Sequence, residues 1–282
     1  MHMSERPSQS QILESLSVVR EFDVEAELER RVDFLAQYLA RTGRRTYVLG
    51  ISGGVDSLVA GCLAQRAVAR RRASGESARF IAMRLPYGQQ RDEAEAARCL
   101  DFMAPDEVRT VDIRASVDAM QQALIAAGVD LGDAASQDFL VGNIKARARM
   151  VAQYAVAGAT AGLVIGTDHA AEALMGFFTK HGDGAADVLP LAGLNKRRVR
   201  AVGFALGAPR DLVMKVPTAD LETLAPQRPD EDAFGVSYEA IDDFLEGLPI
   251  DREAERIIVK TYLASAHKRH AAVAPAIARP GL

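Results

Sequence analysis

Apolar and polar positions along the chain follow two different spacings. Between residues 22 and 41, apolar side chains recur at alternating steps of four and three residues, which predicts a helix with one apolar face. Short apolar runs bounded by turn residues predict buried strands instead, and the first of these, TYVL, ends directly before a glycine-rich turn. The predicted strands lie at 45–52, 78–86, 107–113, 161–168 and 211–217. The predicted helices lie at 22–41, 56–72, 91–103, 114–127, 137–161, 195–206, 237–247 and 251–269, with a short helix after residue 168.

Strands that alternate with helices favour a mostly parallel β-sheet covered by helices on both faces, an α/β three-layer sandwich. Such sheets bind ligands at the carboxyl ends of their strands. Both of the densest polar clusters, 52–57 and 166–172, begin where a predicted strand ends. We therefore expect a single domain over residues 1–282 with its site at that edge of the sheet.

Three segments fall outside the regular pattern. They are an N-terminal segment (1–21), an irregular acidic stretch that contains prolines (217–235), and a tail (271–282) that we expect to be flexible. The second has the length and composition of an active-site lid, and we expect it to be disordered without ligand.

The composition is that of an ordinary folded protein. Of the 282 residues, 49% are hydrophobic and 26% are charged, and the formal net charge is −4. A mildly negative chain argues against a nucleic acid partner, and no apolar run reaches the roughly 18 to 20 residues that a membrane helix requires. The polar start, MHMSERPSQSQ, lacks an apolar signal core, so we expect a cytoplasmic protein with no membrane partner. Cys62 and Cys99 are too few for a disulfide framework and are expected to be small core residues.

The turn after the first strand reads GISGGVDS, residues 50–57. Its glycines let backbone N–H groups point at an anion, and the N-terminus of the following helix favours negative charge. Ser52 and Ser57 add hydroxyl donors, whereas Asp56 would repel phosphate unless a divalent cation lay between them. The turn therefore predicts a polyphosphate site with a metal ion. A plain glycine turn in which Asp56 caps the helix remains the alternative, and the G-K-[ST] ending of a Walker A loop is absent.

A second polar cluster, GTDHAAE, follows the fourth predicted strand. Asp168, His169 and Glu172 lie three or four residues apart and could share one helical face. Glu172 is the better candidate for a second magnesium carboxylate opposite Asp56, while Asp168 is expected to be a helix N-cap and His169 a structural residue. A zinc site of His169 and Glu172 is the alternative, but the sequence offers no evident third ligand.

Together these motifs resemble those of the NH3-dependent NAD synthetases. The S-G-G-x-D-S turn is similar to the pyrophosphate-binding loop of the wider ATP pyrophosphatase superfamily, and the most distinctive stretch is GTDHAAEALMGFFTKHGDGAAD. The other matching motifs are RLPYG, VGNIKARARM, LNKR, PTADLE and HKR, so the resemblance covers about residues 10–270. It implies a flavodoxin-like sheet, a homodimer, and amidation of deamido-NAD with free ammonia. ATP would activate the nicotinate carboxylate as an acyl-adenylate, releasing pyrophosphate and then AMP.

The resemblance also implies roles for particular residues. ATP would be bound by Gly50, Ile51, Ser52, Gly53, Gly54, Val55, Asp56, Ser57, Arg84, Gln90, Thr167, Lys196 and Thr218. Deamido-NAD would be bound, near the dimer interface, by Phe139, Asn143, Arg147, Tyr154, Lys180, Asp187, His267 and Lys268. Magnesium would be held by Asp56 and Glu172, and the catalytic residues would be Asp56, Lys196 and Asp183. Asp183 would bind ammonium and take the proton that ammonia must lose before it attacks.

Some of these roles have plain alternatives. The helix that carries Phe139, Asn143 and Arg147 reads equally well as a surface helix, and Asp183 as a loop-shaping residue between glycines. The chain also departs from the family pattern. Val55 stands where many members have glutamine, and Ala266 stands where a glutamate is usual. The tail lacks the usual aromatic and acidic ending.

Other functions fit the sequence less well. A tRNA-modifying enzyme of the same superfamily would need a basic surface or catalytic cysteine pairs, and the chain has neither. A nucleotide sensor that kept only the fold would not need Asp56, Glu172 and Lys196 together. A glutamine-dependent synthetase would need an added glutaminase domain, for which the chain is too short.

Overall fold

The computed structural model describes residues 6–18, 20–88, 93–218, 221, 223–224 and 228–275. Its four strands are all parallel and lie in the order β3-β2-β1-β4. Their bounds are β1 Thr46–Gly50, β2 Arg79–Arg84, β3 Glu107–Thr110 and β4 Gly162–Val164. The predicted parallel α/β sheet is thus confirmed. Its register pairs Gly50 with Met83 and Val48 with Val164, so the strand ends that carry both polar clusters meet at one edge.

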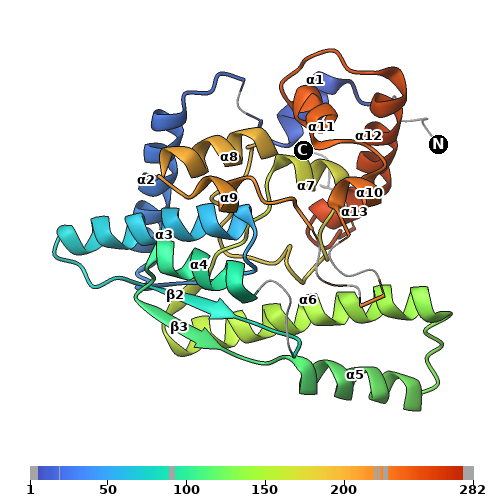
Figure 1. Cartoon of the computed structure of the whole chain (residues 1–282), viewed down its shortest axis with the longest axis horizontal. Coiled ribbons are helices and arrows are strands. Elements are labelled where there is room, and N and C mark those ends of the chain that lie inside the picture. The colour runs from blue at the N-terminus through green and yellow to red at the C-terminus, as the bar shows by residue number, and fades with distance from the viewer. Residues whose placement is uncertain are drawn as a thin grey trace, which may run out of the picture.

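Helices cover both faces of the sheet, as Figure 1 shows. One face carries α2 Val24–Thr42, α3 Val55–Ala73, α4 Glu93–Met103 and α8 Lys196–Ala205, and the other carries α5 Arg114–Ala126 and α6 Ala134–Ala159. Alternation along β1 explains the division, because Tyr47 and Leu49 pack into the first layer and Val48 into the second. The apolar stripe predicted for α2 is buried in the first layer, and so are Cys62 and Cys99.

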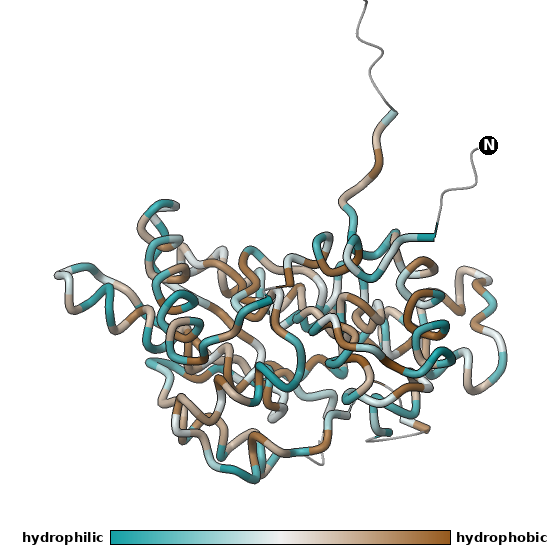
Figure 2. The backbone as a smooth tube through the Cα atoms, turned by 90° about the horizontal axis from the view of Figure 1, so that it is seen from above, coloured by the Kyte–Doolittle hydropathy of each residue, from teal (hydrophilic) through white to brown (hydrophobic). Residues whose placement is uncertain are grey.

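A smaller apolar cluster lies beyond the sheet edge. It joins α1 Gln9–Ser15, α7 Ala170–Met175, α11 Tyr238–Leu245 and α12 Arg252–Ala264 around buried side chains such as Leu174, Ile241 and Ile258. Because α7 holds the second polar cluster, this packing fixes that cluster against the end of β1. Figure 2 shows many hydrophobic residues, in brown, in the middle of the molecule and hydrophilic residues, in teal, at many of the outer turns. Residues 271–275 are exposed, and no helix within the described residues is long and apolar enough to cross a bilayer.

The strand predicted at 211–217 is wrong. Arg210–Val213 form the short helix α9. Beyond it, Pro217 O accepts from Asp230 N at 3.1 Å, and Thr218 forms an isolated antiparallel bridge to Pro229. Pro209 is the N-cap of α9, and Leu212 and Val213 turn into the core against α8. A short run rich in apolar residues fits a strand and a buried helical turn equally well, and the proline decides for the helix.

Further differences are one helix end and two short helices that were not predicted. The predicted helix at 251–269 ends at Ala264 and is followed by a separate turn, α13 Ala266–Arg269. The stretch 217–235 contains a helix, α10 Asp230–Phe234, that the pattern did not predict. The N-terminal segment contains α1, whose capping box of Ser8 and Gln11 is readable in the sequence and was missed.

Candidate active site

The turn between β1 and α3 is built to receive an anion. Gly54 is the N-cap of α3 and has no side chain to bond the first N–H groups, so these groups remain available to a ligand. Ser52 Oγ accepts from Gly54 N at 3.2 Å and lies 3.3 Å from Ser57 Oγ, which donates to Gly54 O at 3.0 Å. Gly53 has a φ of 86°, and a Cβ there would lie 3.1 Å from the backbone nitrogen of Ala96. The turn is thus preformed and tolerates only glycine at Gly53.

Asp56 does not cap the helix, so the alternative interpretation of the turn is excluded. Its Oδ2 instead accepts from Nζ of Lys196, the first residue of α8, at 2.7 Å. Lys196 is 1% exposed. Burial alone would raise the pKa of Asp56 and lower that of Lys196, but their mutual attraction outweighs burial, and both pKa values shift toward the charged forms. The two residues form a buried ion pair.

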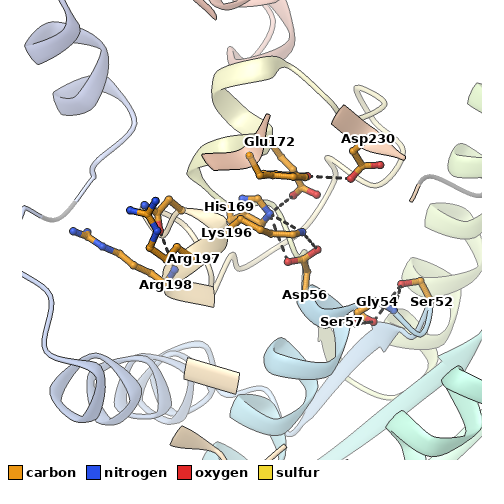
Figure 3. A network of polar contacts seen from close by, with 12 residues as sticks. Ser52, Gly54, Asp56, Ser57, His169, Glu172, Lys196, Arg197, Arg198 and Asp230 are labelled. Carbon is orange, nitrogen blue, oxygen red and sulfur yellow. Dashed lines mark hydrogen bonds and ion pairs between the residues drawn. The ribbon is translucent and has the colours of Figure 1, made fainter. Parts of the chain in front are cut away.

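His169 and Glu172 complete this cluster (Figure 3). His169 Nε2 lies 3.5 Å from Asp56 Oδ1 and 3.7 Å from Glu172 Oε2. Burial, and then the charge of Lys196, lower the pKa of His169 to about 3, so the imidazole is neutral. Burial, and then the charge of Asp56, raise the pKa of Glu172 well above its usual value. Two carboxyls and one ammonium therefore share a largely buried site that favours an added cation.

The cluster fits a divalent cation. Asp56 Oδ1 and Glu172 Oε2 are buried and have no hydrogen-bond partner. Unsatisfied buried oxygens are rare, and carboxylate oxygens are the ligands that magnesium prefers. Asp56 and Glu172 face each other here, as predicted from their positions at two strand ends.

A cavity of about 410 Å³ joins the turn to the N-terminal half of α6. Its size lies in the usual range for small-molecule sites. The predicted residues that line it are Gly50, Ile51, Ser52, Gly54, Val55, Asp56, Ser57, Phe139, Asn143, Thr167, Glu172, Asp183, Thr218 and Lys268. The two candidate clusters and the candidate acceptor helix thus share one cavity.

The acceptor side of the cavity carries an exposed ring and several polar groups. Phe139 is 58% exposed, and Asn143, one turn further along α6, accepts from Thr179 Oγ1 at 3.0 Å. Arg147 donates to Lys180 O at 3.2 Å, so the three positions do lie along one side of the helix. A surface ring beside a fixed amide and a guanidinium suits a ligand with aromatic and anionic parts.

Asp183 lies in the same region, on the turn that follows α7. Its Oδ1 accepts from Thr179 N at 2.9 Å, and burial raises its pKa above the usual range in spite of that bond. Lys268 donates to Gly176 O at 2.9 Å and Phe178 O at 3.0 Å. Lys180 donates to His267 O at 2.6 Å. The C-terminal segment is thereby tied to the rim of the cavity.

A sequence model of the NAD synthase family matches residues 27–272, most of the chain. The chain belongs to the NAD synthase family. It is therefore an enzyme of NAD synthesis, as the motifs indicated, and the sensor and tRNA-modifying alternatives fall away.

Three NAD synthase relatives illustrate the similarity. The NH(3)-dependent NAD(+) synthetase of Burkholderia cenocepacia is 62% identical over 261 residues, 93% of this chain and 93% of that one. A solved NAD+ synthetase from Burkholderia pseudomallei is 58% identical, with a TM-score of 0.81 over 94% of this chain and 98% of that one. A solved NMN synthetase from Francisella tularensis is 33% identical, with a TM-score of 0.79 over 91% of this chain and 100% of that one.

Some residues predicted from the NAD synthase pattern do not line the cavity. Arg84 is buried and bonded to Ile51 O and, at 2.9 Å, to Glu93. Asp187 accepts from Val164 N at 2.7 Å, and its charge acts on the neighbouring Tyr154, whose pKa is raised by burial and then by that charge. Asp187 thus bonds the end of β4, and Tyr154 on α6 lies near enough for that charge to act on it. Five further predicted residues do not line the cavity, namely Arg147, Lys180, His267, Lys196 and Gly53. Gln90 is outside the described residues.

Asp168 is not the N-cap of α7, so that prediction is wrong. The N-cap is His169, whose side chain makes no capping bond. Asp168 is instead a half-buried carboxyl whose pKa is raised to about 8, by burial first and then by the charges of Asp183 and Asp56. In this NAD synthase Asp168 therefore lies close enough to Asp183 and Asp56 for their charges to act on it, although it does not line the cavity.

Several residues that line the cavity of this NAD synthase were missed, among them Gln153 and Asp230. Gln153 Oε1 accepts from Gly50 N at 2.8 Å and so fixes the end of β1 to α6. Its signal was available, because Ala146, Arg149 and Gln153 continue the helical face that begins at Phe139. Asp230, at the start of α10, is 6% exposed and also lines the cavity, and no local pattern marked it.

Proposed function

We propose that the chain catalyses ATP-dependent amidation of deamido-NAD to NAD with free ammonia. The observation that supports this best is the single cavity. It joins an anion-binding turn, two unpartnered carboxylate oxygens and a helix face that offers a ring and an amide. The family match indicates NAD as the product. The name of the relative from Burkholderia cenocepacia, NH(3)-dependent NAD(+) synthetase, indicates ammonia as the nitrogen source.

The reaction needs activation because a carboxylate has no good leaving group. Its oxygen attacks the α-phosphorus of ATP, the bond to the β-phosphate oxygen breaks, and pyrophosphate leaves. Ammonia then attacks the acyl carbon of the mixed anhydride, loses a proton, and AMP leaves. Both steps gather negative charge around phosphorus, so fixed dipoles and cations supply most of the catalysis.

Residues of the chain divide this work. The N–H groups after Gly54, with the Ser52 and Ser57 hydroxyls, bind the departing pyrophosphate, and Lys196 neutralises it. Asp56 and Glu172 would hold magnesium, which when bound lowers the charge of the phosphates. Asp183 holds ammonium beside the acyl carbon and takes its proton.

The likeness to the NMN synthetase from Francisella tularensis favours a second acceptor, the mononucleotide of nicotinate. Both acceptors present the same carboxylate, so the activation chemistry is unchanged. They differ in the adenylyl half, which the outer part of the acceptor side would have to bind. Phe139, exposed at the cavity, is the group best placed to stack on an additional ring.

One assay tests the proposed function. The chain is incubated with ATP, magnesium, ammonium and deamido-NAD, and AMP, pyrophosphate and NAD are measured together. We expect the three products in equal amounts, none of them when ATP or deamido-NAD is omitted, and no NAD when ammonium is omitted. A parallel reaction with nicotinate mononucleotide shows which acceptor has the higher kcat/KM. Absence of pyrophosphate with both acceptors would refute the proposal.

We also propose a cytoplasmic homodimer with the acceptor site near its interface. The support lies on α6, where Leu140, next to Phe139, is 40% exposed and Val151, further along the same helix, is 60% exposed. Apolar side chains gathered on the outside of one long helix are typical of an interface.

The described part of the proposed lid is bonded to α6. Lys145 is 4% exposed, and its Nζ donates to Leu221 O at 2.8 Å and to Thr223 Oγ1 at 3.0 Å. Asp138 accepts from Thr223 N at 2.8 Å and Leu224 N at 2.7 Å. The predicted disorder of the whole stretch stays a prediction, because 219–220, 222 and 225–227 lie outside the described residues.

Replacing Lys145 with methionine should uncouple the two half-reactions. Two hydrogen bonds are lost, each worth about 1 kcal/mol, so water should reach the acyl-adenylate up to roughly thirtyfold more often. The measurement is the ratio of AMP to NAD formed at low ammonium, which should rise above that of the wild type. Lys260→Met, on the exposed side of α12, is the matched control and should leave the ratio unchanged. An unchanged ratio in a folded Lys145→Met variant would show that these bonds do not retain the intermediate.

A further inference from the structure

The carboxylate cluster contains an imidazole that the proposed reaction does not use. His169 is 1% exposed, and its Nε2 lies 3.5 Å from Asp56 Oδ1 and 3.7 Å from Glu172 Oε2. Figure 3 shows the ring between these two carboxylates. The three atoms come from the start of α3 and from the start and first turn of α7, two elements held in place by separate apolar clusters. Their arrangement is therefore a fixed property of the fold.

The spacing of these atoms suits ligands of one ion. Two atoms bound about 2.1 Å from the same divalent cation lie no more than about 4.2 Å apart. Both distances from His169 Nε2 fall below that limit. The atoms of Asp56, His169 and Glu172 all lie within 4.8 Å of one another, so a small side-chain movement brings all three into one coordination sphere.

Hydrogen bonding within the fold does not account for this imidazole. His169 Nδ1 is buried without a partner, as are Asp56 Oδ1 and Glu172 Oε2. Its Nε2 lies 3.4 Å from Lys196 Nζ, a long contact. Lys196 makes its short bond, 2.7 Å, to the other carboxylate oxygen of Asp56. A cation at the cluster would leave that bond in place. It would give a partner to Asp56 Oδ1 and Glu172 Oε2, which have none, and to His169 Nε2, which has only the long contact.

We propose that His169 is the third protein ligand of this site, and that the site takes a nitrogen-binding divalent cation such as Mn²⁺, Co²⁺ or Zn²⁺ more tightly than Mg²⁺. This proposal rests on the proposed function, in which Asp56 and Glu172 hold a cation, and extends it. Magnesium prefers oxygen ligands, whereas one imidazole with two carboxylates suits transition metals. The sequence placed Asp56 opposite Glu172, but it did not show that His169 faces both, because His169 and Asp56 are far apart in the chain.

Pulsed electron paramagnetic resonance of the Mn²⁺ complex tests the proposal directly. The full chain is prepared with natural and with ¹⁵N-labelled histidine and is measured with Mn²⁺ and without nucleotide, so that no adenine nitrogen contributes. We expect a ¹⁴N hyperfine coupling that is replaced by a ¹⁵N coupling in the labelled protein. His169→Gln should abolish the coupling and lower the affinity for Co²⁺ at least about tenfold. His270→Gln, an exposed position, should keep both.

Bound Mn²⁺ without histidine nitrogen coupling would overturn the proposal, and so would a coupling that survives in a folded His169→Gln variant. The labelled wild type is informative even if that variant does not fold. NAD formation with Mg²⁺, assayed on the same wild-type preparation, tests the proposed function separately from the metal-ligand role of His169. If NAD forms but no nitrogen couples to Mn²⁺, the role of His169 is wrong and the proposed function stands.

Discussion

Replacing Lys196 with methionine should lower the rate of pyrophosphate release by about 10³-fold or more, because a buried cation would no longer neutralise the leaving group. Lys196 is the first residue of α8, and its Nζ lies 2.7 Å from Asp56 and over the ring of Tyr238 at 5.2 Å. No other cation is bonded to Asp56 within the described residues. The measurement is pyrophosphate formed in the first turnover with saturating ATP, magnesium and deamido-NAD.

The same substitution should also destabilise the fold, and this effect must be separated from catalysis. Removing one partner of a buried ion pair typically costs about 3–5 kcal/mol, since the remaining charge has no partner in a dry site. The melting temperature and the circular dichroism spectrum show whether the variant is folded at the assay temperature. A folded Lys196→Met variant that releases pyrophosphate within tenfold of the wild-type rate would contradict the assigned role.

Local patterns were sufficient to predict the sheet and the turn. The run from β1 into α3 carries its own signals, namely a buried strand, glycines and an acidic first turn, and the structure places all three where they were expected. The prediction of a strand at 211–217 was wrong because the apolar residues there show neither helical nor strand periodicity. Pro209 at the N-cap and the packing of Val213 in the core favour a helical turn instead. Capping residues near Ser8 were a readable signal that was missed.

The interactions that complete the site join distant parts of the chain. Lys196 bonds Asp56 across 140 residues, and Gln153 bonds Gly50 across 103. No spacing rule reaches that far, and only the family resemblance brought Lys196 and Asp56 together. At Asp168 a local pattern misled instead, because its position before α7 suggested a cap, whereas it is a half-buried carboxyl with a raised pKa.

Replacing Asp183 with asparagine should slow amide formation by about 10²- to 10⁴-fold while adenylate formation changes little, as expected for loss of a general base. Asparagine has the same shape and can still accept the bond from Thr179 N, so the turn should keep its structure. Exchange of labelled pyrophosphate into ATP, with deamido-NAD present and ammonium absent, measures the first half-reaction. NAD formed at saturating ammonium measures the second.

Asp168→Asn is the control that decides between neighbouring carboxyls, because Asp168 is close enough for the charge of Asp183 to raise its pKa. If Asp168→Asn uncouples the half-reactions and Asp183→Asn does not, the base is Asp168. Equal loss of both half-reactions in Asp183→Asn would mean that this aspartate shapes the turn. The pH profile gives a further distinction. Burial raises the pKa of Asp183, so wild-type amide formation should fall as pH drops through that raised value, and Asp183→Asn should lose this acid limb. A residue that only shapes the turn would leave the acid limb in place.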